Sequence, residues 1–225
     1  MSWFSVTRSA VLLLASCLPA AALAQAEPKG HYLTAYGQLS RIGSSTLTES
    51  GAQGGGAGLQ ARFGRGLGGG GDFGYRFGNG WAAEVEWNYR SHSLSSLRRG
   101  STTLARQGDF ASNTLLVNGV RRFASSRAWT PYVGAGVGVV LEIDLDLQPE
   151  GNGTSRAYSS SGRVVPQLIG GVEYALTPTW RLVSDARWLR VGALEATNAS
   201  GNSGGRVRSP TYNPLSVQVG VRYGI

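Results

Sequence analysis

Residues 213–224 read NPLSVQVGVRYG, and apolar and polar residues alternate from position 215 onward. Leu215, Val217, Val219, Val221 and Tyr223 share one face, and Ser, Gln, Gly and Arg occupy the other. A period of two is the repeat of a β-strand, whose successive side chains point to opposite faces. The stretch therefore predicts a strand with one apolar and one polar face.

Seven earlier segments have the same character, and none of the segments between them shows a helical period. Each has about ten residues, the length that a tilted strand needs to cross the hydrocarbon layer of a membrane. The eight predicted strands cover residues 32–41, 67–77, 81–90, 114–123, 130–141, 164–176, 180–191 and 215–223. The run Leu115-Leu116-Val117 and the pair Arg121-Arg122 leave the inward face of the fourth strand undecided.

The connections between these strands are alternately short and long. Residues 78–80, 124–129 and 177–179 form short connections, the first with Gly-Asn-Gly turn chemistry. Residues 42–66, 91–113, 142–163 and 192–213 form long loops rich in Gly, Ser, Asn and Thr. We therefore expect an all-β chain, an eight-stranded antiparallel up-and-down transmembrane β-barrel, with short periplasmic turns, long extracellular loops and both termini in the periplasm.

The first residues resemble a secretory signal. Arg8 supplies the basic region, an apolar stretch runs from Ala10 to Leu23, and Ala22-Leu23-Ala24 is a small-x-small cleavage site. We expect residues 1–24 to be removed and residues 25–225 to form the barrel domain. Cys17 lies in a segment that also resembles a lipoprotein signal, but we favour a cysteine that is discarded with the signal.

Composition excludes several classes of function. The net charge is +8, yet charged residues make up only 15% of the chain, and there is no basic stripe. We therefore expect no nucleic-acid partner and assign the counter-charge to anionic lipid. Two His and one discarded Cys do not build a typical zinc site, so we expect no metal and no cofactor.

The two faces of the predicted strands differ as they would in a barrel wall. The apolar faces carry aromatic residues near their ends, as in a girdle at the lipid interfaces: Trp81, Trp87, Tyr89, Trp180, Trp188 and Tyr223. The polar faces carry charges of both signs, as a small lumen would: Arg76, Glu84, Glu86, Glu173, Arg181, Asp185, Arg187 and Arg222. These charges either pair into a plug or line a narrow water-filled path, and the small interior of eight strands favours the plug.

Three motifs suggest chemistry that their context does not support. Gly134, Gly136 and Gly138 share a face, but no helix or lysine follows as in a phosphate loop, so we expect them to make space for large lumen side chains. The run 68–71 is expected near the point where the second strand leaves the membrane. Glu84 and Glu86 fit ion-paired lumen residues as well as a catalytic pair, and no substrate cleft is evident.

His92 is the centre of a Ser-His-Ser sequence at the end of the third strand. Lipid-modifying barrels use Ser and His, but the residue two positions beyond His92 is Leu94, and the next acid is Asp109 in a predicted loop. We therefore expect a solvated loop histidine and no catalytic residue. The hypothesis for the arginines in or beside the long loops is that they contact anionic lipopolysaccharide; the alternative is that they only form a soluble loop surface. These arginines are Arg62, Arg65, Arg98, Arg99, Arg106, Arg206 and Arg208.

Two internal stretches and the C-terminus carry a family resemblance. Residues 131–138, PYVGAGVG, and 113–120, NTLLVNGV, resemble the middle strands of small outer-membrane β-barrels, the group of the OmpA transmembrane domain, OmpX and the OmpA-like surface antigens. Gly220, Tyr223 and Ile225 are similar to the C-terminal signal read by the barrel-assembly machinery, although the chain ends in Ile rather than Phe.

The resemblance implies an integral protein of the Gram-negative outer membrane without enzymatic activity, with a structural or surface-interaction role. The alternatives are a narrow pore, a carrier of small apolar molecules, or, third, a lipid-modifying enzyme. The implied partners are outer-membrane lipid, lipopolysaccharide, the barrel-assembly machinery, periplasmic chaperones and an unidentified extracellular ligand.

Overall fold

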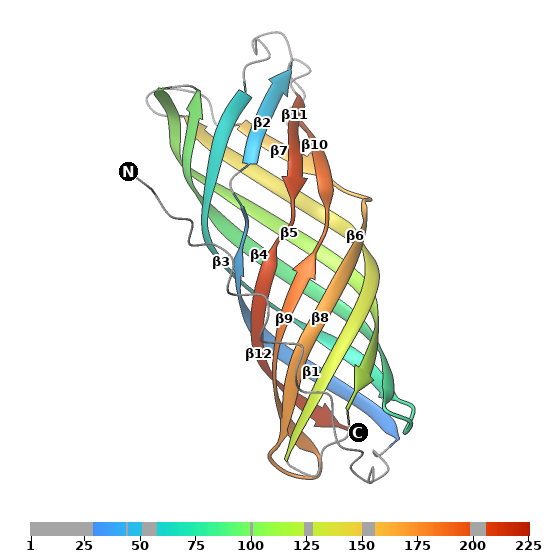
Figure 1. Cartoon of the computed structure of the whole chain (residues 1–225). Helices are drawn as coiled ribbons and strands as arrows, with labels where there is room; N and C mark the ends of the chain where they lie inside the picture. Colours follow the sequence, from blue (N-terminus) through green and yellow to red (C-terminus); the bar gives the residue numbers. More distant parts are fainter. Residues whose placement is uncertain are drawn as a thin grey trace, which may run out of the picture.

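Antiparallel strands make up nearly all of the computed structural model, which describes residues 29–43, 45–50, 58–99, 101–123, 128–149, 156–198 and 206–225 (Figure 1). The signal segment and Cys17 lie outside these residues. None of the described residues forms a helix long and apolar enough to cross a membrane. The described strands are β1 (Gly30–Arg41), β2 (Ser45–Ser50), β3 (Gly58–Arg76), β4 (Trp81–Arg99), β5 (Thr102–Arg122), β6 (Trp129–Pro149), β7 (Arg156–Ser160), β8 (Val164–Ala175), β9 (Trp180–Leu189), β10 (Gly192–Asn198), β11 (Arg206–Tyr212) and β12 (Leu215–Gly224).

Eight of these strands close into a ring, which we call the lower tier. Its order is β1-β12-β9-β8-β6-β5-β4-β3, and β3 pairs back onto β1. Tyr32 of β1 thus has Gly224 of β12 on one side and Gly74 of β3 on the other. Closure leaves this ring without a free edge, as a lipid environment requires. The predicted eight-stranded antiparallel barrel is confirmed.

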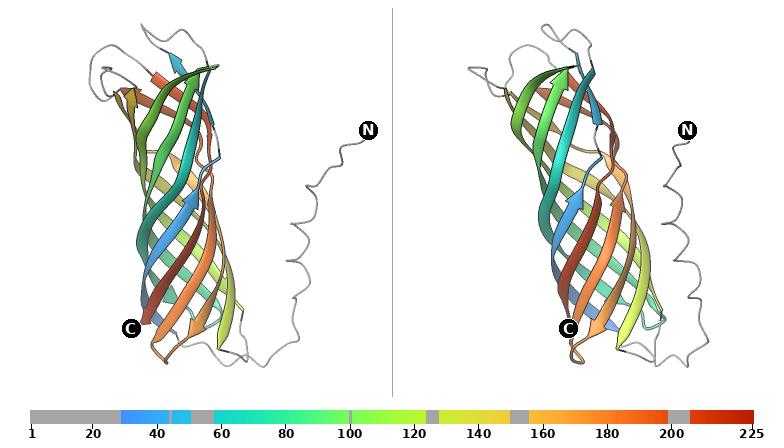
Figure 2. Two further views of the ribbon diagram at one scale, coloured as in Figure 1. Left: turned by 90° about the vertical axis from the view of Figure 1, so that its left-hand side faces the viewer. Right: turned by 60° about the vertical axis from the view of Figure 1, so that its left-hand side comes forward.

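A second ring stands on the first, and we call it the upper tier. β3, β4, β5 and β6 run through both rings, and β2, β11, β10 and β7 complete the upper one, with β7 pairing back onto β6. In Figure 1 these four short strands lie at the top, and the C-terminus lies at the bottom. Two further views show the tall, tilted wall that results (Figure 2).

The prediction that residues 42–66, 91–113, 142–163 and 192–213 are loops was wrong for most of their described residues. β4 runs to Arg99 and β5 starts at Thr102, and the other three segments contain strands as well. The Gly run 68–71 also lies within β3, paired on both sides with β1 and β4. These segments lack clear alternation, but neighbouring strands offer them backbone partners, and such context outweighs intrinsic β propensity.

The two tiers are offset by breaks in four neighbouring strands. β1 gives way to β2 after Arg41, β8 follows β7 across residues 161–163, β10 follows β9 across 190–191, and β12 follows β11 across 213–214. Gly162 has a φ of 75°, and Pro214 has no N–H to give to a ladder. The other four strands pass the same level without a break, so the rings share one wall.

The structure also settles the face of β5 that the sequence left undecided. Leu116, Asn118, Val120 and Arg122 point inward, while Val117 is exposed on the outside. Arg121 lies outside with its guanidinium over the ring of Trp81. The two arginines therefore serve opposite faces of the wall.

Candidate functional site

The lower lumen is filled by ion pairs, and Arg222 of β12 is their hub. Its Nη2 donates to Glu84 at 2.8 Å, its Nη1 donates to Glu173, and its Nε donates to the Thr34 hydroxyl at 2.7 Å. Its guanidinium also lies 4.2 Å from the centre of the Tyr32 ring. Its Nη2 also lies 3.5 Å from the Asp72 Oδ1 of β3, so four strands around the lumen contact one side chain that is 1% exposed.

A second cluster lies farther up the lumen, around Glu86 of β4. Glu86 forms an ion pair with Arg187 and accepts hydrogen bonds from the amides of Asn118 and Gln167, both at 2.8 Å. Arg187 also donates to Asp185 at 2.9 Å. Each charge meets an opposite charge and neutral donors, which is the condition under which buried ions are tolerated.

The eight predicted lumen charges are not equally placed. Arg76 and Arg181 approach Glu173 at 4.0 and 3.7 Å, and Arg181 keeps partial exposure at the lower rim. Arg76 is buried, and so are the other six, which lie within the two clusters: Glu84, Glu86, Glu173, Asp185, Arg187 and Arg222. Arg76 and Arg181 are secondary partners of a carboxylate that already binds Arg122.

Sequence reasoning missed several members of the network. Asp72 accepts from Thr34 at 2.8 Å, and Arg122 forms a two-pronged pair with Glu173. Tyr32 donates to Glu84 at 2.7 Å, and Tyr132 donates to Asp185 at 2.7 Å. The alternation of β5 identifies Arg122 as a lumen residue once the inward face of that strand is known. The alternation of β1 and β6 places Tyr32 and Tyr132 on the inward face in the same way.

The acidic pair considered for catalysis is fully committed to these contacts. Glu84 binds Arg222 and Tyr32, and Glu86 binds Arg187. Both carboxylates are almost completely buried. They therefore act as counter-charges within the lower tier.

The prediction of a solvated loop histidine was wrong. His92 is 1% exposed and points inward from β4, and its Nε2 lies 2.8 Å from the Ser40 hydroxyl. It turned inward because β4 continues past its predicted end and keeps its alternation. Ser91 and Ser93 point the other way. The Nδ1 atom makes no hydrogen bond with any described residue, so this Ser–His pair has no orienting carboxylate of the kind that a catalytic triad requires.

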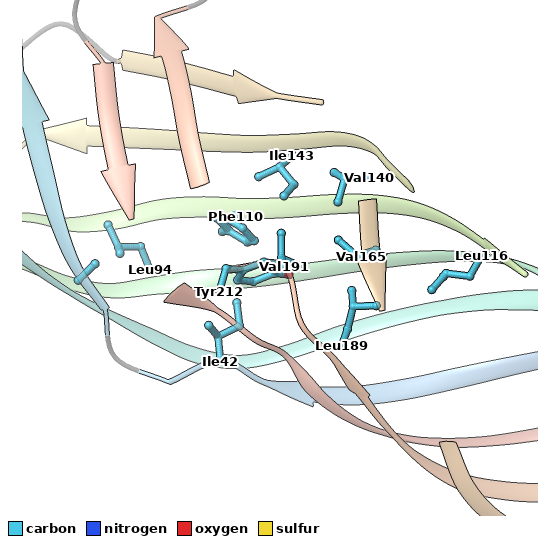
Figure 3. Close-up of a cluster of buried hydrophobic side chains, with 11 residues drawn as sticks. Ile42, Leu94, Phe110, Leu116, Val140, Ile143, Val165, Leu189, Val191 and Tyr212 are labelled. Carbon is cyan, nitrogen blue, oxygen red and sulfur yellow. The ribbon is translucent and has the colours of Figure 1, made fainter. Parts of the chain in front are cut away.

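Above the ion pairs the interior becomes apolar (Figure 3). Buried side chains from seven strands and from the breaks between tiers pack against one another here. The Phe110 and Tyr212 rings pack in a tilted arrangement with their centroids 4.7 Å apart, and Phe110 also contacts Phe63 and His92 edge to face. The cluster comprises Ile42, Ala61, Leu94, Phe110, Leu116, Val140, Ile143, Val165, Leu189, Val191 and Tyr212.

The outer face of the lower tier is apolar and carries aromatic rings. Trp180 and Tyr223 stack at 4.9 Å where β9 meets β12. All six residues predicted for the girdle are exposed: Trp81, Trp87, Tyr89, Trp180, Trp188 and Tyr223. Of the predicted C-terminal signal, Ile225 is exposed and its N–H donates to the His31 carbonyl at 2.9 Å. Gly220 faces Tyr36, and a Cβ there would lie 2.6 Å from the Tyr36 Cβ.

The hypothesised lipopolysaccharide arginines are described only in part. Arg62, Arg65 and Arg98 are exposed on β3 and β4. The side chains of Arg99, Arg106, Arg206 and Arg208 lie outside the described residues. Within the part of the chain that the structure covers, no group of three His, Cys, Asp or Glu residues is arranged to hold a metal ion.

Comparison with solved structures shows the fold. Neisserial surface protein A is 18% identical, with a TM-score of 0.53 over 88% of this chain and 100% of that one. OprG of Pseudomonas aeruginosa is 17% identical, with a TM-score of 0.54 over 87% and 97%. A major outer membrane protein of Thermus thermophilus is 13% identical, with a TM-score of 0.54 over 87% and 99%.

No curated protein matches the sequence. The outer membrane protein β-barrel domain, in contrast, matches residues 10–224, which is nearly the whole chain. A closed antiparallel ring, an apolar exterior and a buried ionic interior agree with that match. The chain therefore belongs to the family of outer membrane β-barrel proteins.

Proposed function

We propose that the protein is a non-enzymatic barrel, closed to ions across the membrane, that acts through the β-structured tier it presents outside the cell. One observation carries this proposal, the stacking of a lower ring filled with ion pairs beneath a second closed ring. In this assignment the short turns and both termini lie in the periplasm, and the upper tier stands above the outer leaflet.

The filled lumen supports a barrel that does not conduct. Arg222 and Arg187 each bridge carboxylates from different strands, so the pairs tie opposite walls together. Stable conductance steps from the purified protein in planar bilayers would contradict this part of the proposal. Equal lipid A mass spectra from cells with and without the protein are expected if it has no lipid-modifying activity.

The upper tier supports a surface role because it continues the hydrogen-bonded wall of the barrel. β4 and β5 pair from Trp81 to Arg99 as one long hairpin, and β3 pairs with β4 beside it, so the exposed Arg62 and Arg65 of β3 and Arg98 of β4 lie on this wall. We assign these arginines to anionic groups of lipopolysaccharide. The girdle residues would then mark the two lipid interfaces, and Gly220, Tyr223 and Ile225 would be read during assembly by the barrel-assembly machinery, after chaperones deliver the chain.

Charge reversal tests the lipopolysaccharide contact. Replacing Arg62, Arg65 and Arg98 by Glu is expected to reduce the lipopolysaccharide that copurifies with the barrel. Lys29→Glu, at the opposite rim, is the matched control and should leave the amount unchanged. Equal lipopolysaccharide content in all three proteins would remove the assignment.

A second candidate function follows from the apolar interior of the upper tier. The cluster around Phe110 and Tyr212 lies inside the barrel where the two rings meet. A water-filled vestibule at this level would be lined by polar side chains instead. An apolar interior suits small apolar molecules that enter from outside. Calorimetric titration of the barrel in lipid nanodiscs with 1-octanol, against empty nanodiscs, tests it. Heat equal to that of the empty discs would exclude this candidate.

A further inference from the structure

The inward face of β4 changes character along its length, and Arg90 lies at the change. Glu86, Asn88, Arg90, His92 and Leu94 are successive inward residues, because alternate residues of a strand share a face. The first two belong to the polar lower lumen, and Leu94 belongs to the apolar cluster. Arg90 therefore occupies the boundary between the two tiers.

Arg90 has no counter-ion within salt-bridge distance among the described residues. Its side chain is completely buried, and its Nε donates one long hydrogen bond, 3.3 Å, to the Ser216 hydroxyl of β12. β4 and β12 are separated by β3 and β1 in the ring, so the side chain reaches across the lumen. Both Nη atoms are buried, and neither has a hydrogen-bond partner in the described part of the chain.

This isolation distinguishes Arg90 from the other buried arginines that the structure describes. Arg76, Arg122, Arg187 and Arg222 each have a carboxylate within 4.0 Å. A buried guanidinium without an anion in contact is strongly unfavourable, since it gives up its hydration and keeps only a longer-range attraction, here to Glu86. Two free, parallel N–H groups on a fixed fork match the two oxygens of one carboxylate.

Several polar groups next to Arg90 are donors or hydroxyls. His92 lies two residues along the same face, and its Nδ1 is buried without a partner among the described residues. When Ser40 donates to Nε2, Nδ1 carries the proton and is a free donor. Ser112, which pairs with Arg90 across the strands, shares a hydrogen bond of 3.2 Å with the Tyr212 hydroxyl. The boundary thus offers several donors to an anion.

The apolar cluster begins directly above this group. Phe110 pairs with His92 across the strands, and its ring packs on Tyr212 and Phe63. Figure 3 shows Phe110, Tyr212 and Leu94, from three strands, and Ile42, from the break after β1, around one part of the interior. A molecule that reached Arg90 from the mouth of the upper tier would place its remaining atoms among these side chains.

We propose that Arg90 anchors the carboxylate of a small amphipathic acid whose apolar part lies in the upper-tier cluster. This inference rests on the second candidate function, an interior that admits apolar molecules, and names the class of ligand. The carboxylate accepts from Nη1 and Nη2 of Arg90, and the His92 Nδ1–H completes the anion site. The alkyl or aryl part points toward the extracellular mouth and replaces contacts within the cluster.

The test uses the folded full chain in lipid nanodiscs at pH 8, titrated calorimetrically with octanoate, 1-octanol and acetate against empty nanodiscs. Octanoate is expected to bind at least tenfold more tightly than 1-octanol, and acetate should bind far more weakly than octanoate. Arg90→Gln should weaken octanoate binding tenfold or more and leave 1-octanol unchanged. Arg90→Lys, which keeps the charge but loses the fork, should fall between the two. Arg41→Gln, an exposed arginine at the top of β1, is the matched control and should bind octanoate normally.

The outcomes separate this inference from the function on which it rests. If 1-octanol binds and octanoate binds no better, or if Arg90→Gln leaves octanoate binding intact, the anchor is wrong and the apolar interior stands. If acetate binds as tightly as octanoate, the site is a simple anion site, and the amphipathic assignment fails. If neither octanoate nor 1-octanol binds, both proposals fail together. Unheated gel mobility confirms that each variant is folded.

Discussion

Replacing Arg222 by Met tests whether the ion pairs of the lower lumen hold the barrel together. Met keeps the length and the apolar volume of the stem but removes the guanidinium. The change deletes the hydrogen bonds to Glu84, Glu173, Asp72 and Thr34 and leaves the three carboxylates in place. The loss of unfolding free energy therefore measures how much the buried carboxylates depend on the Arg222 guanidinium.

The structure sets the magnitude through the partners that remain. Glu173 keeps Arg122, so its charge stays compensated. Glu84 keeps only the Tyr32 hydroxyl, and Asp72 keeps only the Thr34 hydroxyl, so both are left buried with no cation within salt-bridge distance among the described residues. Removing one partner of a buried ion pair costs about 3–5 kcal/mol. We expect the free energy of unfolding to fall by that amount.

Urea unfolding of the barrel in lipid vesicles, followed by tryptophan fluorescence, measures this free energy. Lys29→Met removes a cation from the exposed lower rim and is expected to change it by less than about 0.5 kcal/mol. Adding Glu84→Gln to Arg222→Met should recover part of the loss, because one of the two unpaired carboxylates becomes neutral. A loss below about 1 kcal/mol for Arg222→Met, or no recovery in the double variant, would refute the role of Arg222 as the hub.

Three further predictions concern the tiers and their boundary. Gly66→Ala would place a Cβ 2.3 Å from the His92 ring, so the free energy of unfolding in urea should fall by about 1–3 kcal/mol. Adding His92→Ala should relieve most of that loss. If the effects of the two substitutions are simply additive, the contact is contradicted. In planar bilayers the wild type should show no conductance steps. Glu86→Ala combined with Arg187→Ala should give conductance steps if this ion pair closes the lumen. A folded double variant without such steps would show that other residues close it. Arg90→Met should keep or raise the free energy of unfolding because no ion pair is lost, whereas a drop above about 3 kcal/mol would reveal a partner that the described contacts lack.

Strands that span the lower tier could be predicted because one face meets an apolar surface and the other a polar interior. Along β12, Val217 and Val219 are exposed on the outside while Gln218 and Arg222 are buried inside, so the alternation is nearly unbroken. β5 departs from this rule because Leu116 and Val120 are apolar and inward. A binary pattern cannot orient a strand whose two faces are both apolar in the middle.

The upper tier could not be predicted because its strands gain their stability from neighbours that the sequence does not identify. β2 pairs with β11 through residues 48–50, and β10 pairs with β7 through two residues, which is too little to mark a strand locally. The same limit hid the position of His92. A loop assignment for residues 91–113 made it solvated, whereas the continuing β4 ladder turns it inward.

Glycine offers a sequence signal for the lumen that alternation alone does not use. Gly74 lies directly opposite Tyr32, and a Cβ there would come within 2.2 Å of the tyrosine ring. Gly136 stands opposite Asn118 in the same way, and a Cβ there would lie 1.9 Å from the Asn118 amide oxygen. In a ring of eight strands the interior holds side chains and little else, so each large inward residue needs a small one beside it. An inward glycine therefore marks the place where a neighbouring strand sends a large polar side chain across the lumen, and pairing glycines with such residues would fix both the register and the members of the network.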